Sequence, residues 1–218
     1  MESFRPNPVV AKHINPRGFT LIEMLIVLAI IIIITAIALS GQSGFDRTLA
    51  LNNATYDIAL SIREAQSYGV SSQSFSGSVN APYGIYFRTS VPSSYILFVD
   101  TDPAVAGGSR PDAKPGDGLF NSGASPSEVV KTYYLHNGFS VNSLCAYTSS
   151  GNRVCTSNGL TELALTFSRP NTRTVVRGYA SGWGTYSSAC LSVVGRSGDE
   201  RYVQVAQTGQ VSVVTACP

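Results

Sequence analysis

The sequence predicts an α+β protein: a long N-terminal helix, membrane-spanning in its first half, packed on an antiparallel β-rich C-terminal head. Two observations predict the helix. Residues 19–39 are almost entirely apolar, and beyond them apolar side chains recur at spacings of three and four. A third predicts the head, because after Gly69 short aromatic and β-branched runs alternate with polar residues. The expected organisation is a leader (1–18), the two halves of the helix (19–40 and 41–69) and the globular head (70–218).

The apolar run has the length of a membrane-spanning helix. At about 1.5 Å per residue it extends roughly 30 Å, the thickness of the hydrocarbon core of a bilayer. The residues before it carry Arg5, Lys12 and Arg17 against Glu2 alone. By the positive-inside rule this leader stays in the cytoplasm. We therefore expect a single pass through the cytoplasmic (inner) membrane, with the head periplasmic or extracellular.

Glu23 is the one charged residue of the apolar run, and an acid inside a membrane-length segment usually marks a function. One alternative is an ordinary signal peptide cleaved after the run, at a small-x-small site such as Ala36–Ala38. The run is longer than an ordinary signal core, and Glu23 would only weaken ordinary export, so we favour a retained helix. The other alternative is that the side chain of Glu23 only extends back to the membrane surface.

The stretch RGFTLIEMLIVLAII, which begins at Arg17, resembles the class III signal of type IV pilins and pseudopilins. The resemblance implies that prepilin peptidase cleaves between Gly18 and Phe19 and that Phe19 is then N-methylated. Glycine suits such a site because, without a Cβ, its backbone can enter a narrow protease cleft. The implied fold is pilin-like. The implied partners are other pilin or pseudopilin subunits, prepilin peptidase, the inner-membrane assembly platform and membrane lipid.

In that family the acid that matches Glu23 pairs with the free amine of Phe19 in a neighbouring subunit. An unpaired charge buried among apolar helices is costly, so this pairing would set the register between subunits. The β-rich head and C-terminal hairpin resemble minor pseudopilins of the GspH/FimT type. The expected function is a minor subunit of a type II secretion pseudopilus or a type IV pilus, which assembles and catalyses no reaction.

The second half of the helix is amphipathic. Residues 41–44 include two glycines, which would let the helix bend or unwind. Gly69 is the expected stop. The expected apolar face comprises Leu51, Ala54, Ile58, Ile62 and Ala65.

Eight runs in the head read as strands, and the short spacing between neighbouring runs favours antiparallel hairpins. A tight turn is expected at residues 207–209, between the last two. The expected strands are 83–89, 94–100, 129–136, 138–145, 161–168, 189–195, 201–206 and 210–216.

One acidic loop is a candidate calcium site, since calcium prefers hard oxygen ligands at alternating positions. The candidate ligands are Asp100 and Asp102, with Asp112 or Asp117 completing the shell. The spacing departs from an EF-hand and its closing glutamate is absent. The alternative is a solvated loop, because aspartate is favoured in turns for local hydrogen bonding alone.

Four cysteines lie in the C-terminal half, without a C-x-x-C pair. In an exported domain an even number indicates disulfides, and four cysteines allow three pairings. We predict Cys145–Cys155, which would span a short hairpin, and Cys190–Cys217, which would hold the last strands together. The alternative is four buried thiols in a domain that stays in the cytoplasm.

Other functional classes have weaker support. The sequence has no nucleotide-binding loop and no nucleophile elbow, and a triad in the mature chain could use only His136, so we do not expect an enzyme. A DNA-binding minor pilin for DNA uptake is the alternative function. It would need clustered arginines, and the C-terminal turn carries none, which counts against DNA as a partner. The arginines that the fold would have to gather are Arg169, Arg173, Arg177, Arg196 and Arg201.

Overall fold

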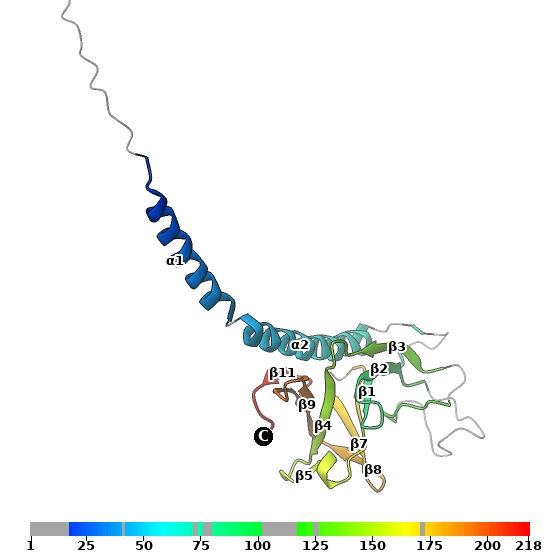
Figure 1. Cartoon of the computed structure of the whole chain (residues 1–218). Helices are drawn as coiled ribbons and strands as arrows, with labels where there is room; N and C mark the ends of the chain where they lie inside the picture. Colours follow the sequence, from blue (N-terminus) through cyan, green and yellow to red (C-terminus); the bar gives the residue numbers. More distant parts are fainter. Residues whose placement is uncertain are drawn as a thin grey trace, which may run out of the picture. The chain divides into compact units, whose positions relative to one another are not determined.

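The computed structural model describes residues 18–40, 42–71, 74–75, 80–101, 117–123, 127–170 and 173–218. The chain divides into two compact units, Met1–Gly44 and Phe45–Pro218. The first contains helix α1 (Leu21–Ser40). The second contains most of helix α2 (Gln42–Ser71) and all the strands of the head (Figure 1). The α+β architecture predicted from the sequence is therefore confirmed.

The helices follow the sequence pattern, with two corrections. Residues 42–44, where a bend or unwinding was expected, are helical, because α2 already begins at Gln42. Gly69 does not end α2, which continues to Ser71. A Cβ at Gly69 would collide with the backbone carbonyl of Phe167, so glycine is needed there for the close approach of helix and sheet.

The strands form two sheets in which every pairing is antiparallel. The six-stranded sheet has the order β3-β2-β1-β6-β7-β8 and the five-stranded sheet the order β11-β10-β9-β4-β5. The first six strands are β1 (Tyr83–Arg88), β2 (Ser94–Val99), β3 (Val129–Tyr134), β4 (Ser140–Tyr147), β5 (Arg153–Cys155) and β6 (Glu162–Phe167). The others are β7 (Thr174–Tyr179), β8 (Trp183–Tyr186), β9 (Ser188–Val194), β10 (Glu200–Val205) and β11 (Val211–Val214).

All eight predicted strands are present, and three strands were missed. β5 has only three residues and is followed by a 3-10 turn (Thr156–Asn158), so it shows no clear alternation. β8 contains a glycine in four residues. β7 alternates in burial as a strand should, but it follows the turn-rich sequence RPNTR, which hid it.

The prediction of a hairpin between runs 129–136 and 138–145 is wrong. β3 pairs with β2, whereas β4 pairs with β9 and β5 in the other sheet. Asn137 and Gly138, with φ of 61° and 78°, make the turn at which the chain changes sheets. The hairpins β1–β2, β9–β10 and β10–β11 form as expected, the last through a turn at Gly209.

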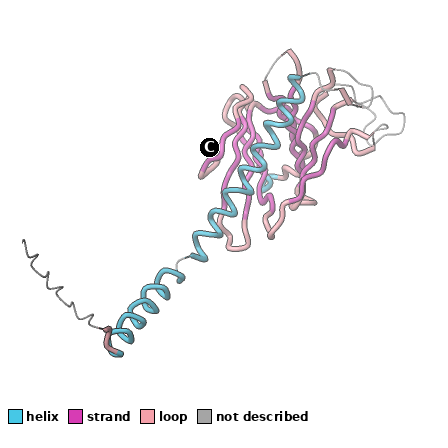
Figure 2. The backbone as a smooth tube through the Cα atoms, turned by 90° about the horizontal axis from the view of Figure 1, so that it is seen from above, coloured by secondary structure: helices cyan, strands magenta, loops and turns pink. Residues whose placement is uncertain are grey.

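Helix α2 lies across the strands of the head (Figure 2), and one hydrophobic core contains side chains of α2 and of both sheets. Four of the five side chains predicted for the apolar face of α2 belong to it: Leu51, Ile58, Ile62 and Ala65. Burying such side chains stabilises a fold by roughly 1.5–3 kcal/mol each for the larger ones. Among the sheet residues of this core are Phe87, Leu97, Leu165 and Phe167 from the six-stranded sheet and Leu144, Leu191, Val193 and Val203 from the five-stranded sheet.

Candidate functional site

The N-terminus of α1 is capped by Thr20. Its hydroxyl oxygen accepts the backbone N–H of Glu23 at 3.3 Å, and its carbonyl accepts the N–H of Met24 at 3.3 Å. Thr20 and Glu23 thus occupy the two positions of a capping box, which satisfies N–H groups that the first turn leaves unpaired. Glu23 also places its negative charge in the first turn, where the helix dipole favours it.

The surface of α1 is apolar on every side. The side chains of residues 21–39 are all exposed, including that of Glu23, and Phe19 just before them is 75 % exposed. Thr35, a polar residue of this helix, donates its hydroxyl to the carbonyl of Ile31 at 2.6 Å, which makes it compatible with an apolar environment. Over Leu21–Leu39, α1 is long and apolar enough to cross a membrane.

Comparison with family models identifies this region. Residues 15–39 match the model described as the prokaryotic N-terminal methylation motif. The chain carries this motif. Comparison with curated proteins gives no match, and comparison with solved structures gives none.

The methylation motif is typical of type IV pilins and pseudopilins, which are generally structural subunits without enzymatic activity. The chain is therefore a prepilin-like protein. A class III signal implies processing by prepilin peptidase and assembly with pilins. Together, the motif and the apolar helix indicate a membrane-anchored protein.

The acidic loop is held at its two ends by buried carboxylates. Asp100, 1 % exposed, accepts the N–H of Gly118 at 2.7 Å. Glu128, fully buried, accepts the N–H groups of Thr101 and Asn121, at 3.2 and 2.7 Å. Buried carboxylates need such donors, so these bonds explain why both acids are tolerated there.

Of the four predicted calcium ligands, Asp102 and Asp112 lie outside the described residues. Asp117 accepts the N–H of Leu119 at 2.9 Å, a local turn contact of the kind expected for a solvated loop. Within the described ranges no group of three or more acidic, histidine or cysteine side chains could hold a metal. Calcium binding by the complete loop stays a prediction.

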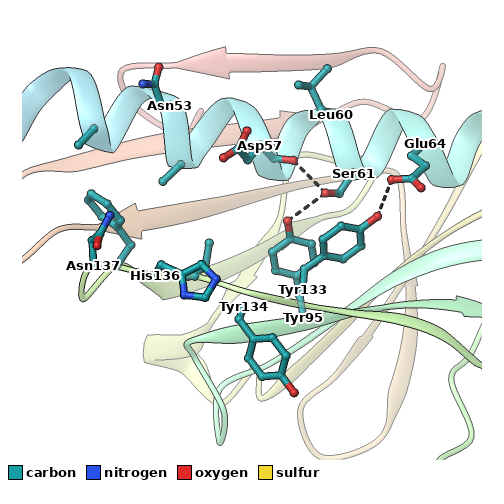
Figure 3. A pocket seen from close by; sticks show the side chains of 14 residues that line it. Asn53, Asp57, Leu60, Ser61, Glu64, Tyr95, Tyr133, Tyr134, His136 and Asn137 are labelled. Carbon is teal, nitrogen blue, oxygen red and sulfur yellow. Dashed lines mark hydrogen bonds between the residues drawn. The ribbon is translucent and has the colours of Figure 1, made fainter.

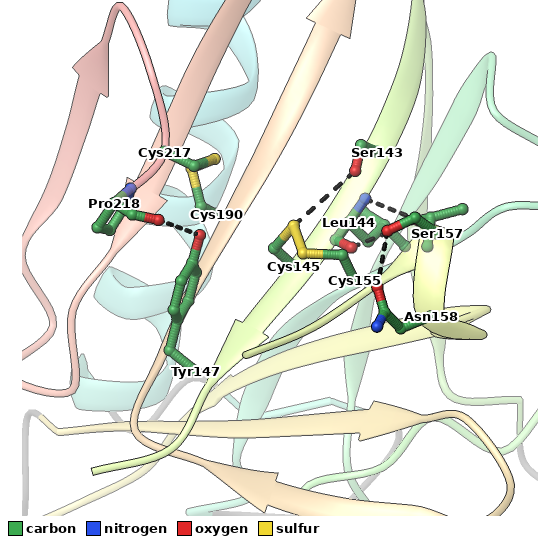
Figure 4. The surroundings of a disulfide bond; sticks show 11 residues. Ser143, Leu144, Cys145, Tyr147, Cys155, Ser157, Asn158, Cys190, Cys217 and Pro218 are labelled. Atoms are coloured by element: carbon green, nitrogen blue, oxygen red, sulfur yellow. Dashed lines mark hydrogen bonds between the residues drawn. A yellow bond between two sulfur atoms is a disulfide. The ribbon is translucent and has the colours of Figure 1, made fainter. Parts of the chain in front are cut away.

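The four cysteines form two disulfides, Cys145–Cys155 and Cys190–Cys217, the pairs named from the sequence (Figure 4). Their Cα atoms are 4.0 and 5.9 Å apart. Cys145 stands directly opposite Cys155 in β5 and opposite Cys190 in β9. Three cysteines therefore follow one another across the five-stranded sheet.

A cavity of about 570 Å³ lies beside α2, and we call it the α2 groove (Figure 3). One wall is a stripe of α2 and the other is built from β2, β3 and the turn that follows β3. Among its lining residues Asp57 and Glu64 carry negative charge, and no lysine or arginine is present. The groove is lined by Ala50, Asn53, Ala54, Asp57, Leu60, Ser61, Glu64, Tyr95, Tyr133, Tyr134, Leu135, His136, Asn137 and Phe139.

A network of hydroxyl and carboxylate groups joins α2 to the sheet at the floor of the α2 groove. Tyr95 and Ser61 share a hydrogen bond of 3.0 Å between their hydroxyl groups. Tyr133 and Tyr68 both donate to the Glu64 carboxylate, Tyr68 at 3.0 Å. The Tyr133 ring stacks on that of Tyr95 at 5.0 Å between centroids. These contacts fix the helix on the sheet with polar groups that are themselves satisfied.

The network raises the pKa of its phenols. Burial, partly offset by the Ser61 hydrogen bond, raises the pKa of Tyr95 to about 12. Burial and then the Glu64 carboxylate raise the pKa of Tyr133 above its ordinary value. The hydrogen bond to Glu64 raises the pKa of Tyr68. All three therefore remain neutral hydrogen-bond donors at physiological pH.

His136 was considered for a catalytic triad and the arginines for DNA binding, and their contacts are as follows. His136 is exposed at the rim of the α2 groove. Arg177 donates to the Asp117 carbonyl at 3.1 Å and to Thr185 at 2.6 Å, while Arg201 donates to Asn52 at 3.0 Å. Arg169 donates to the carbonyl of Val70, and Arg196 lies against the backbone of Gly138. These contacts tie four of the five arginines to different parts of the head.

The α2 groove and Glu128 were not predicted from the sequence. A signal for the groove was present, because Asp57, Ser61 and Glu64 recur at spacings of four and three and so lie on one face of a helix. The aromatic wall had no such signal, because Tyr95 and Tyr133 are brought together by the pairing of β2 with β3.

Proposed function

We propose that the chain is a minor pilin or pseudopilin subunit of the GspH/FimT type, assembled through its N-terminal helix into a type II secretion pseudopilus or a type IV pilus. The observation that carries this proposal is the methylation motif at residues 15–39, on a helix whose apolar side chains are all exposed. Such a helix needs a membrane or other apolar helices around it.

In this proposal prepilin peptidase cleaves between Gly18 and Phe19, and Phe19 becomes the N-methylated terminus. Among the described residues, and apart from its chain neighbours, no atom lies within 4 Å of where a Cβ at Gly18 would stand. Packing therefore does not require a glycine at position 18, which supports a role of Gly18 in cleavage.

Glu23 is proposed to pair with the amine of Phe19 in the neighbouring subunit. It is the one charged side chain of α1, and apolar helices that surround it would remove it from water. A cationic amine at the start of the adjacent helix would compensate its charge, and the pair would fix the stagger between subunits. The inner-membrane assembly platform would carry out the insertion.

The assignment to a minor subunit rests on the head. Its two antiparallel sheets, its C-terminal β10–β11 hairpin and its two disulfides support an exported, β-rich domain. We place this head in the periplasm or outside the cell, on the far side of the cytoplasmic membrane from the leader.

Intact-mass measurement of the full chain, extracted from membranes with and without prepilin peptidase, tests the proposal. With the peptidase, the expected mass corresponds to a chain that begins at Phe19 and carries one methyl group. Without the peptidase, the leader should remain. A Gly18→Val variant should also keep its leader, whereas a chain that begins near Gln42 would show ordinary signal cleavage and contradict the proposal.

A further inference from the structure

The terminal strands of the two sheets differ in length. β8, β11 and β5 have four, four and three residues, whereas β3 has six. A short terminal strand offers few backbone groups to a further strand, so shortness is one way in which proteins protect the edges of their sheets. Among the terminal strands that the structure describes, β3 is therefore the one that its length protects least.

The two halves of β3 differ in a second kind of protection. Opposite its first half, the register with β2 shifts at a bulge between Leu97 and Phe98. Lys131 also lies near this bulge, with its ammonium 4.3 Å from the centre of the Tyr133 ring. Bulges and lysines at an edge both discourage the addition of a strand. The second half, Thr132–Tyr134, keeps a regular register with β2 and contains no lysine, proline or glycine.

The backbone of this second half has hydrogen-bonding groups on its free side. The N–H of Leu135 donates to the carbonyl of Ser93 at 2.8 Å, in continuation of the β2–β3 register. Residues of an antiparallel strand alternate between those that bond to the partner strand and those whose backbone groups face away from it. The backbone groups of Tyr133 therefore face β2, whereas those of Thr132 and Tyr134 face away from β2.

The α2 groove lies beside this half of β3 (Figure 3). Its lining includes Tyr134 and His136 on one side and Asp57 and Leu60 of α2 on the other. Its volume of about 570 Å³ is in the range of ligand-binding clefts. Asp57 and Leu60 are exposed, and the side chain of Tyr134 points away from α2. Side chains alternate along a strand, so a strand added beside Tyr134 would place every second side chain in the groove.

The charge of the α2 groove determines which side chain fits there. Asp57 and Glu64 carry negative charge, and the groove lining contains no lysine or arginine. Beyond His136 the sign of the charge changes, because Arg47 and Arg196 line an adjoining cavity. Complementary charge therefore favours a basic side chain beside Asp57.

We propose that the α2 groove binds an extended, basic segment of another protein in the compartment of the head. The segment would pair with Thr132 and Tyr134 as a further strand of the six-stranded sheet, with a lysine or arginine of its own beside Asp57. In this mode of recognition main-chain hydrogen bonds provide affinity and alternate side chains provide specificity. The backbone groups of a helix are already paired, so a helix of another subunit does not fit this site. The inference goes beyond the proposed function and does not depend on it.

Selection from a peptide library tests the chemistry of the partner. The full chain, purified in detergent and immobilised, is offered a display library of random ten-residue peptides. Enriched peptides should contain a lysine or arginine, with β-branched or aromatic residues at alternating positions. Enrichment of acidic peptides, or no enrichment, would overturn the proposal.

Methylation of the peptide backbone tests strand pairing. Fluorescence anisotropy measures the affinity of one enriched peptide, made in two N-methylated forms. Methylation of every second amide, on the edge that faces β3, removes donors and should weaken binding by about tenfold or more. Methylation of the other amides, which face solvent, should have a much smaller effect. Equal effects of the two forms would refute strand pairing.

A proline in β3 tests the position of the added strand. Thr132→Pro removes a donor that faces away from β2 and should weaken peptide binding by roughly threefold to tenfold. The matched control is Val213→Pro in β11. The N–H of Ala206 donates to the carbonyl of Gln210, and the same alternation turns the N–H of Val213 away from β10. Near-UV circular dichroism checks that both heads stay folded. A folded Thr132 variant that binds normally would contradict the proposal.

An amide in place of one carboxylate tests the charge. Asp57→Asn should weaken peptide binding by roughly twofold to fivefold, as expected for an exposed ion pair. Asp199→Asn, at an exposed aspartate between β9 and β10, should leave binding unchanged. Equal effects of the two substitutions would contradict the proposed position of the basic side chain. A dimer of the chain in sedimentation velocity that the peptide dissociates would assign this edge to a second copy and also overturn the proposal.

Discussion

Helix α1 and the head obtain their stability from different sources. The side chains of α1 described in the structure are all exposed, so this helix contributes no core of its own. The head buries side chains of α2 between two sheets and adds two disulfides. A helix as apolar as α1 is stable only where lipid or other helices surround it, whereas the head has the parts of a self-sufficient domain.

This difference separates assembly from folding. Changes in α1 should affect incorporation into a filament and leave the unfolding of the head unchanged. Changes in the core of the head should affect its unfolding and leave processing at Gly18 unchanged. Substitutions in the two regions test this separation, from the largest expected effect to the smallest.

The largest effect is expected for Glu23→Gln. Neutral Gln leaves the neighbour's amine without its charged partner among apolar helices, and breaking a buried pair costs about 3–5 kcal/mol. Incorporation into sheared filaments, measured by immunoblotting, should fall by roughly two to three and a half orders of magnitude. Glu162→Gln, at an acid of β6 in the head, is the control and should assemble normally. Normal incorporation of the Glu23 variant would show that its charge has no role in assembly.

In the head, Ile58→Ala should destabilise the fold by roughly 2–5 kcal/mol, because a fully buried side chain would leave a cavity in the shared core. Thermal unfolding of the purified full chain, followed by near-UV circular dichroism, measures this loss. Leu60→Ala, two residues along the same helix but 58 % exposed, should change stability by less than about 0.5 kcal/mol. Equal effects would show that α2 is not held in the core as described.

The disulfides should contribute unequally. Cys190→Ser with Cys217→Ser opens a loop with a sequence separation of 27 and should cost about 3.5 kcal/mol in the chain-entropy model. Cys145→Ser with Cys155→Ser opens a loop with a sequence separation of 10 and should cost about 2.7 kcal/mol. Denaturant unfolding gives both values, and the reverse order would contradict the loop-closure argument.

Cys217→Ser alone has a further expected result. It leaves Cys190 as a thiol opposite Cys145 in the neighbouring strand, so thiol–disulfide exchange should produce some Cys145–Cys190 and release Cys155. Non-reducing peptide mapping detects the exchanged pair. Its absence would mean that the two sulfurs do not reach each other despite their register.

The two regions also differ in how far the sequence predicts them. Helix α1 is a local structure, so the unbroken apolar run sufficed to predict it, although its cap at Thr20 was not predicted. The head depends on contacts between distant segments. The alternation in each strand predicted eight of its strands, but the change of sheet at Asn137 and Gly138 has no local signal that distinguishes it from a hairpin. The Cys145–Cys155 pair was predictable because the two residues are close in the sequence, whereas the strand register places Cys145 opposite both Cys155 and Cys190 and does not by itself select the pairing.

The smallest effect at neutral pH is expected for Tyr95→Phe. The variant loses one hydrogen bond, 3.0 Å long, to Ser61 and keeps the ring, which should cost about 1 kcal/mol. A distinct effect appears at high pH. The folded chain holds the Tyr95 proton up to a pKa of about 12, whereas the unfolded chain releases it near 10. The raised pKa of Tyr95 therefore stabilises the fold fully below pH 10. This contribution is lost as the pH rises from 10 to 12, by about 1.4 kcal/mol per pH unit.

Urea unfolding of the wild-type chain and the Tyr95→Phe variant at pH 7, 10, 11 and 12 measures that slope. The variant should lose stability less steeply above pH 10, so the two curves should converge or cross. The slope will not vanish, because Tyr133, whose pKa is also raised, still contributes. Tyr56→Phe, at a tyrosine of α2 that is 56 % exposed, should follow the wild-type curve. Parallel curves for wild type and Tyr95→Phe would mean that Tyr95 titrates as an exposed phenol, which would contradict its burial beneath α2.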